Sequence, residues 1–180
     1  MVYILLAPGF EEAEALVPAD LLRRAGIEVA LVALEGDCVS GGHQIVVQAD
    51  LPIAQVNLSR MEMLVLPGGG KGVDNLSKAP AVAALVQQAV QRDVWLAAIC
   101  AAPTLLGQLG LLQGKQAVCY PGLEGKLTGA EVKAGCQVVQ DGKLITAQAA
   151  GAAYAFGLKL ISVLAGEAKA REVQNAIYYT

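Results

Sequence analysis

The chain has 180 residues, 55% of them apolar and 16% charged, a composition that indicates a packed globular protein and excludes a disordered one. The formal net charge of −3 argues against a surface for nucleic acid or for an anionic membrane. No apolar run approaches the roughly 18 residues that cross a bilayer, so we expect one domain over residues 1–180 and no membrane partner.

The apolar segment 1–8 could be taken for the core of a signal peptide. It lacks a basic flank and runs into an acidic segment instead of a cleavage site, so we expect it to be a first strand and the protein to be cytoplasmic. The four cysteines show no C-x-x-C spacing, which favours reduced thiols over a disulfide framework or a zinc site. They are Cys38, Cys100, Cys119 and Cys136.

Strands and helices alternate along the chain, beginning with a buried strand at 2–7 and a helix at 11–25 whose acids come first and whose arginines come last. Further strands are expected at 28–34, 62–66, 94–99 and 116–120, and hairpins at 38–50 and 137–147. Helices are expected at 79–91, 150–164 and 168–179, and another is expected to begin at residue 103. This alternation predicts a mostly parallel sheet covered by helices on both faces, with ligands at the carboxyl ends of the strands.

Cys100 follows six apolar residues, and the small residues Ala101 and Ala102 lead from it straight into the amphipathic run that begins at Pro103. A cysteine at such a strand-to-helix turn lies near free backbone N–H groups at the positive end of a helix, which favours the nucleophilic thiolate. The alternative is a buried structural cysteine that ends the strand.

Glu14 is the acid of the first helix that we expect to point inward, because it shares a helical face with Pro18 and Leu21. Glu11 and Glu12 are expected to point outward. All three acids could also be ordinary first-turn helix acids, which complement the helix dipole. In a parallel sheet the first strand and the strand before Cys100 end at one edge, so Glu14 and Cys100 are expected to meet.

Glycines follow the strand at 62–66 and reach the same edge. They could form a simple turn, or the backbone at Gly68 and Gly69 could join the N–H of Ala101 in an oxyanion hole. A phosphate-binding loop is disfavoured because the Walker spacing is absent. A buried carboxyl beside a thiolate would have a raised pKa and could act as an acid and base.

Three motifs, at 11–26, 65–69 and 97–103, together resemble the ThiJ/PfpI superfamily, and within it the parkinsonism-associated deglycases and bacterial YajL-type proteins. The resemblance implies a flavodoxin-like three-layer α/β sandwich with a cysteine nucleophile elbow, and a homodimer. It also implies that Cys100 is the nucleophile, that Glu14 is its protonated partner, and that the amides of Gly69 and Ala101 line the oxyanion site. No cofactor or metal is implied.

The resemblance implies more than one activity. The first is a cofactor-independent glyoxalase or deglycase that acts on methylglyoxal or on early glycation adducts. The alternative is a redox-sensing chaperone whose Cys100 is oxidised to a sulfinate in response to oxidative stress. PfpI-type members of the superfamily are also described as proteases.

The sequence departs from the family pattern in three places. Tyr120 stands where the motif has a histidine near the cysteine, which argues against a Cys-His protease; it could donate a hydrogen bond, although we favour a space-filling role. The only histidine, His43, lies in the early hairpin where the family often has arginine. The expected Gly-Pro-Gly turn is replaced by residues 149–151, and Gln148 just before it joins Tyr120 and His43 as a candidate pocket residue.

Overall fold

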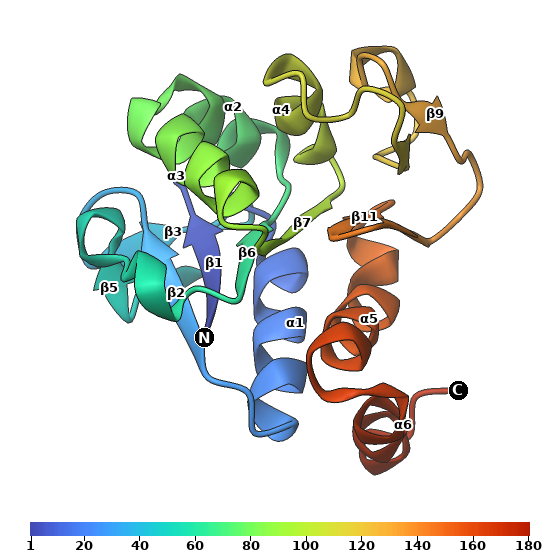
Figure 1. Ribbon diagram of the computed structural model, residues 1–180. Coiled ribbons are helices and arrows are strands. Elements are labelled where there is room, and N and C mark those ends of the chain that lie inside the picture. Colours follow the sequence, from blue (N-terminus) through green and yellow to red (C-terminus); the bar gives the residue numbers. More distant parts are fainter.

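The computed structural model describes residues 1–180 and has a seven-stranded central sheet (Figure 1). Its strand order is β10-β11-β7-β6-β1-β2-β5. The strands are β1 (Val2–Leu6), β2 (Val29–Ala33), β5 (Leu51–Pro52), β6 (Met63–Leu66), β7 (Trp95–Ile99), β10 (Val138–Asp141) and β11 (Leu144–Ala147). All neighbouring pairs are parallel except β10 and β11, so the predicted mostly parallel sheet is confirmed.

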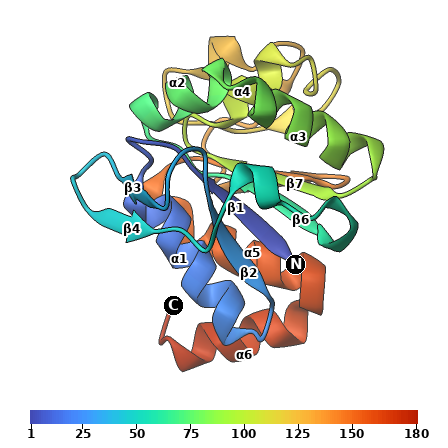
Figure 2. The same ribbon diagram turned by 90° about the vertical axis from the view of Figure 1, so that its left-hand side faces the viewer.

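Helices cover both faces of this sheet, as Figures 1 and 2 show. One layer holds α2 (Gly70–Lys78), α3 (Pro80–Gln91) and α4 (Pro103–Gln108), and the other holds α1 (Glu12–Arg24), α5 (Ala153–Ala165) and α6 (Glu167–Ala176). Two separate hydrophobic cores lie between the sheet and these layers. The expected three-layer α/β sandwich is therefore confirmed.

Strand β1 shows how the sheet divides the two cores. Tyr3 and Leu5 belong to one core, whereas Val2, Ile4 and Leu6 belong to the other, because successive side chains of a strand point to opposite faces. All five are buried, as expected for a central parallel strand. With β6 and β7 running parallel beside it, the loops that follow these three strands meet at one edge of the sheet.

Two expected elements differ from the structure. The segment after β6 is helical as α2, although no helix is expected from the sequence between this strand and the helix at 79–91. The strand expected at 116–120 is limited to β8 (Gln116–Ala117), which pairs in parallel with β9 (Glu131–Val132) outside the central sheet. Single-turn 3₁₀ helices occur at η1 (Ile53–Gln55), η2 (Leu58–Arg60), η3 (Glu124–Lys126) and η4 (Ala150–Ala152).

The early hairpin consists of β3 (Cys38–Ser40) and β4 (Val46–Gln48), and it stands apart from the central sheet as expected. Its turn packs on the loop between β1 and α1: the N–H of Gly42 donates to the carbonyl of Phe10 at 2.8 Å, and the N–H of Gly9 donates to Ser40 at 2.8 Å. The hairpin therefore supports the loop that leads into the first helix. None of the helices is both long enough and apolar enough to span a bilayer.

Candidate active site

Cys100 forms the turn between β7 and α4, and its φ of +65° is unusual for a residue with a side chain. Its N–H donates to the carbonyl of Ala147 at 2.9 Å, and its carbonyl accepts from the N–H of Tyr120 at 2.8 Å. The adjacent Ala101 and Ala102 are buried. The predicted sharp turn is present, and these contacts hold Cys100 in a strained conformation of the kind found at functional sites.

Glu14 lies in the first turn of α1 and is only 1% exposed, which confirms that it points inward. Its Oε2 accepts from the N–H of Gly68 at 2.9 Å, while Oε1 is buried and makes no hydrogen bond of ordinary geometry. Burial raises the pKa of the Glu14 carboxyl to about 7, and the charge of Glu11 adds to this effect. Hydrogen bonds with Cys100 and Gly68 act in the opposite direction.

Gly68 lies close to both Glu14 and Cys100. A Cβ at Gly68 would lie 2.4 Å from Glu14 Oε2 and 2.6 Å from Cys100 Cβ, so no side chain fits between the two groups. Gly69 has a φ of +86°, and a Cβ there would lie 2.5 Å from the carbonyl of Gly9. Only glycine fits at these two positions, and the oxyanion role of Gly68 and Gly69 stays a prediction.

The pKa of Cys100 is raised to about 12, contrary to the expectation that the turn favours thiolate. Burial is the largest cause, followed by the charge of Glu14 and the hydrogen bond with it. The N–H groups of Gly69 and Ala101 do act on the sulfur and lower its pKa, as the position at a helix start predicts. Burial and the carboxyl outweigh them because the charged form of a buried thiol loses its hydration.

Cys100 and Glu14 therefore behave as one coupled acid pair. Since the Glu14 charge is one cause of the raised Cys100 pKa, the sulfur ionises more readily when the carboxyl holds a proton. Near neutral pH the sulfur therefore stays a thiol, and the Glu14 carboxyl is the group of the pair that ionises. This arrangement can move a proton from a thiol to a carboxylate as the sulfur forms a bond.

The candidate pocket residues do not all converge on this pair. Tyr120 is 49% exposed and its hydroxyl makes no hydrogen bond. The structure therefore does not support the space-filling role that we favoured. Gln148 is half-buried and follows Ala147, whose carbonyl accepts from Cys100; its own N–H donates to the carbonyl of Gln137 at 2.9 Å. The substrate role suggested for Gln148 stays a prediction.

All four cysteines are free thiols, as the spacing predicted. Cys119 is buried, and its Sγ donates to the carbonyl of Tyr120 at 3.5 Å, which indicates a structural role. Cys38 and Cys136 are exposed. A groove of about 470 Å³ contains Cys136 and residues of α5 and α6, away from Cys100.

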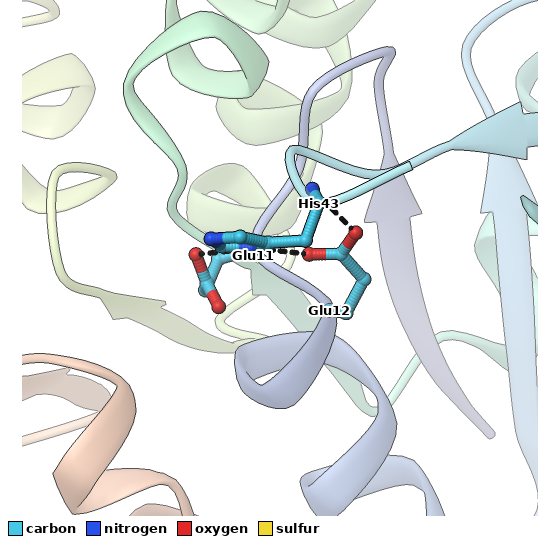
Figure 3. Close-up of side chains that lie close together, drawn as sticks. All are labelled: Glu11, Glu12 and His43. Atoms are coloured by element: carbon cyan, nitrogen blue, oxygen red, sulfur yellow. Dashed lines mark hydrogen bonds and ion pairs between the residues drawn. The ribbon is translucent and has the colours of Figure 1, made fainter. Parts of the chain in front are cut away.

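His43 lies in the turn of the β3–β4 hairpin and contacts the start of α1 (Figure 3). Its Nδ1 is 2.9 Å from Glu12 Oε2 and 3.7 Å from Glu11 Oε2. Glu12 is only 5% exposed, so the expectation that it points outward is wrong: the hairpin, distant in sequence, folds over its carboxylate.

One ligand atom from each of Glu11, Glu12 and His43 lies within 4.8 Å of the others, a spacing a metal ion could use. Both Glu12 oxygens already interact with His43, so the cluster is satisfied without an ion.

The fold and the strained cysteine define an α/β protein of the nucleophile-elbow class. A model of the DJ-1/PfpI family matches residues 1–163, so this chain belongs to the DJ-1/PfpI family. Protein dj-1beta of Drosophila melanogaster is 37% identical over 176 residues, which cover 97% of this chain and 94% of that protein. A deglycase of Pyrococcus abyssi is 30% identical over 171 residues, which cover 91% and 98% of the two chains.

Solved structures of relatives have the same fold. The crystal structure of Drosophila melanogaster DJ-1beta has a TM-score of 0.95 and 36% identity, and the match covers 99% of this chain and 97% of that one. Toxoplasma gondii DJ-1, solved in an oxidized form, has a TM-score of 0.93 and 31% identity, with 99% and 98% covered. The family resemblance inferred from the three sequence motifs is confirmed.

Proposed function

We propose that this protein is a cysteine-dependent glyoxalase or deglycase in which Cys100 is the nucleophile and Glu14 is the acid and base. The observation that carries the proposal is the pair itself: a buried carboxyl with a pKa of about 7 interacts with a strained cysteine, and both lie against Gly68. A base with a pKa near the working pH combines an ionised fraction with a strong tendency to take a proton. The deglycase relative supports the choice of reaction class.

The first step with methylglyoxal forms a carbon–sulfur bond. The Glu14 carboxylate takes the proton of the Cys100 thiol as the sulfur attacks the aldehyde carbon, and the carbonyl electron pair moves to oxygen. The N–H groups of Gly69 and Ala101, which already act on the sulfur, stabilise this negative charge. Glu14 then gives its proton to the oxygen, which leaves a neutral hemithioacetal and a carboxylate.

The second step moves hydrogen between neighbouring carbons. Glu14 removes the proton from the former aldehyde carbon and returns it to the former ketone carbon, while the hydroxyl proton of the first carbon passes to the oxygen of the second. The first carbon is thereby oxidised to the thioester carbonyl and the second is reduced to the alcohol within the same molecule. The product is a lactoyl thioester on Cys100. Water hydrolyses this thioester, which releases lactate and restores the thiol. Methylglyoxal and one water give one lactate, so no external oxidant or reductant is needed.

Lactate formation from methylglyoxal tests the proposal. We expect wild type to form lactate, and Cys100→Ala and Glu14→Gln to lose it, whereas Cys136→Ala keeps it because that exposed thiol lies in a different groove. Turnover in Glu14→Gln close to that of wild type would contradict the role of the carboxyl. Equal inactivity of wild type and Cys100→Ala would contradict the enzyme proposal.

A second candidate function is redox sensing at Cys100. The oxidized form of the Toxoplasma gondii relative favours it, and so do the Glu14 carboxyl and the two backbone N–H groups that act on the sulfur. Two equivalents of hydrogen peroxide would convert the thiol to a sulfinate and give two waters, and a protonated Glu14 could donate to the sulfinate. Intact mass after mild peroxide should show a selective gain of two oxygens that disappears in Cys100→Ala. Equal oxidation of the exposed Cys38 and Cys136 would count against it.

A homodimer is the assembly that we propose for this chain, as the resemblance implies. Light scattering of the purified protein at micromolar concentration should give twice the chain mass. A monomer mass under these conditions would contradict the proposal.

A further inference from the structure

The first turn of α1, which carries Glu14, has no cap of its own. Glu11 occupies the N-cap position, but its side chain makes no capping hydrogen bond. The turn is tied instead to the loop after β6, because the N–H of Glu11 donates to the carbonyl of Gly68 at 3.0 Å. Since Oε2 of Glu14 also bonds to Gly68, the position of this turn determines how the carboxyl meets Cys100.

The β3–β4 hairpin supplies the second tie, through the buried carboxylate of Glu12. Its Oε1 accepts from the N–H of His43 at 2.7 Å and from the N–H of Ile45 at 3.4 Å, and its Oε2 lies 2.9 Å from Nδ1 of His43. The fit is close, because a Cβ at Gly41 would lie 2.2 Å from Glu12 Oε1. The hairpin turn therefore encloses the Glu12 side chain.

We propose that His43 is a positioning residue for Glu14: it fixes the first turn of α1 through Glu12 and, in its protonated form, places a positive charge beside Glu11. The inference deepens the function proposed above and rests on it for its effect on turnover. It assigns a role to a side chain that is 69% exposed and that makes its ion pairs with Glu11 and Glu12.

The effect of the His43 charge on Glu14 follows from the charged groups that lie around each of the two side chains. The charged groups around the His43 ring are Glu12 and Glu11, and both raise the pKa of the imidazole. The largest cause is the hydrogen bond that the ring donates to Glu12. The groups that act on Glu14 are Cys100, Gly68 and Glu11, and the Glu11 charge raises the Glu14 pKa. A protonated His43 offsets that charge, so its loss should raise the Glu14 pKa further.

Three variants test whether the ring contact and the charge of His43 affect Glu14, or whether any substitution in the hairpin does so. His43→Ala removes both the ring contact and the charge, and His43→Arg keeps a charge. Gln48→Ala is the matched control, because this residue is also exposed, lies on β4 of the same hairpin and makes no side-chain hydrogen bond. His43 is exposed, so its replacement leaves no buried cavity.

The Glu14 titration provides a measurement that does not depend on turnover. The carboxyl ¹³C chemical shift of Glu14, assigned by its loss in Glu14→Gln, is followed against pH in each variant. We expect His43→Ala to move the midpoint upward by about half a pH unit, the scale of an exposed ion pair. His43→Arg and Gln48→Ala should stay near wild type.

Methylglyoxal turnover is then measured against pH in the same variants. Because Glu14 acts as a carboxylate, a higher pKa moves the rising limb of kcat to higher pH, and kcat below the midpoint should fall about threefold in His43→Ala. An unchanged Glu14 midpoint in His43→Ala, or an equal shift in Gln48→Ala, would overturn the inference. A shifted midpoint in a protein whose wild type forms no lactate would refute the proposed function and leave the link from His43 to Glu14 in place.

Discussion

Replacing Gly68 by alanine tests the closeness of Glu14 and Cys100 more directly than removing either group. The new Cβ would lie 2.4 Å from Glu14 Oε2, 2.6 Å from Cys100 Cβ and 3.0 Å from the carbonyl oxygen of Ile99, whereas ordinary contacts begin at 3.4 Å. The carboxyl oxygen must therefore retreat by about 1 Å, and the cysteine by nearly as much, unless the backbone shifts. Both reacting groups are retained but pushed apart.

The expected loss follows from this displacement. A misplacement of about 1 Å between reacting groups costs on the order of 100-fold in rate, so kcat/KM for lactate formation should fall by about that factor. Overpacking should also lower the free energy of unfolding by about 1–3 kcal/mol. Lactate formation and urea denaturation, both at pH 7.5, measure the two effects separately.

Gly70→Ala is the matched control for this variant. It lies two residues away at the first position of α2, where a Cβ meets nothing within 4 Å. Alanine should be neutral or slightly stabilising there, and turnover should be unchanged. Wild-type turnover in Gly68→Ala would refute the reasoning, because it would mean that the pair does not need its observed separation.

Two further predictions concern stability at the site. Glu14→Gln should raise the free energy of unfolding at pH 8 by about 1–3 kcal/mol and change it little at pH 4. The reason is that the raised folded-state pKa of Glu14 opposes folding only as the pH rises past the ordinary value of 4.5 towards about 7. Urea denaturation at the two pH values measures this, and a variant less stable than wild type at pH 8 would contradict it. Cys100→Gly should stabilise the fold by about 1 kcal/mol, because glycine adopts the observed φ of +65° without strain. It should also abolish lactate formation, because the thiol is lost. A lower melting temperature than that of Cys100→Ala would argue against stored strain at the elbow.

Features that depend on residues close together in sequence could be predicted from the sequence. The apolar runs of β1 and β7 indicated buried parallel strands, and small residues after Cys100 indicated the sharp turn. The helical spacing of Glu14 with Pro18 indicated that this carboxyl points inward. The meeting of Glu14 and Cys100 followed from one topological rule, that parallel strands end at the same edge of a sheet.

The burial of a side chain and its pKa depend on which distant segments pack against it, so only the tertiary structure determined them. The helix start at Cys100 does lower the thiol pKa, but burial and the Glu14 charge outweigh it, and neither can be read from the local sequence. Glu12 occupies a position that is usually exposed in a first turn, yet the hairpin around His43 buries it. Local sequence determined the backbone path and the facing of side chains, whereas burial and charge at the site depend on contacts between distant segments, which form only in the folded chain.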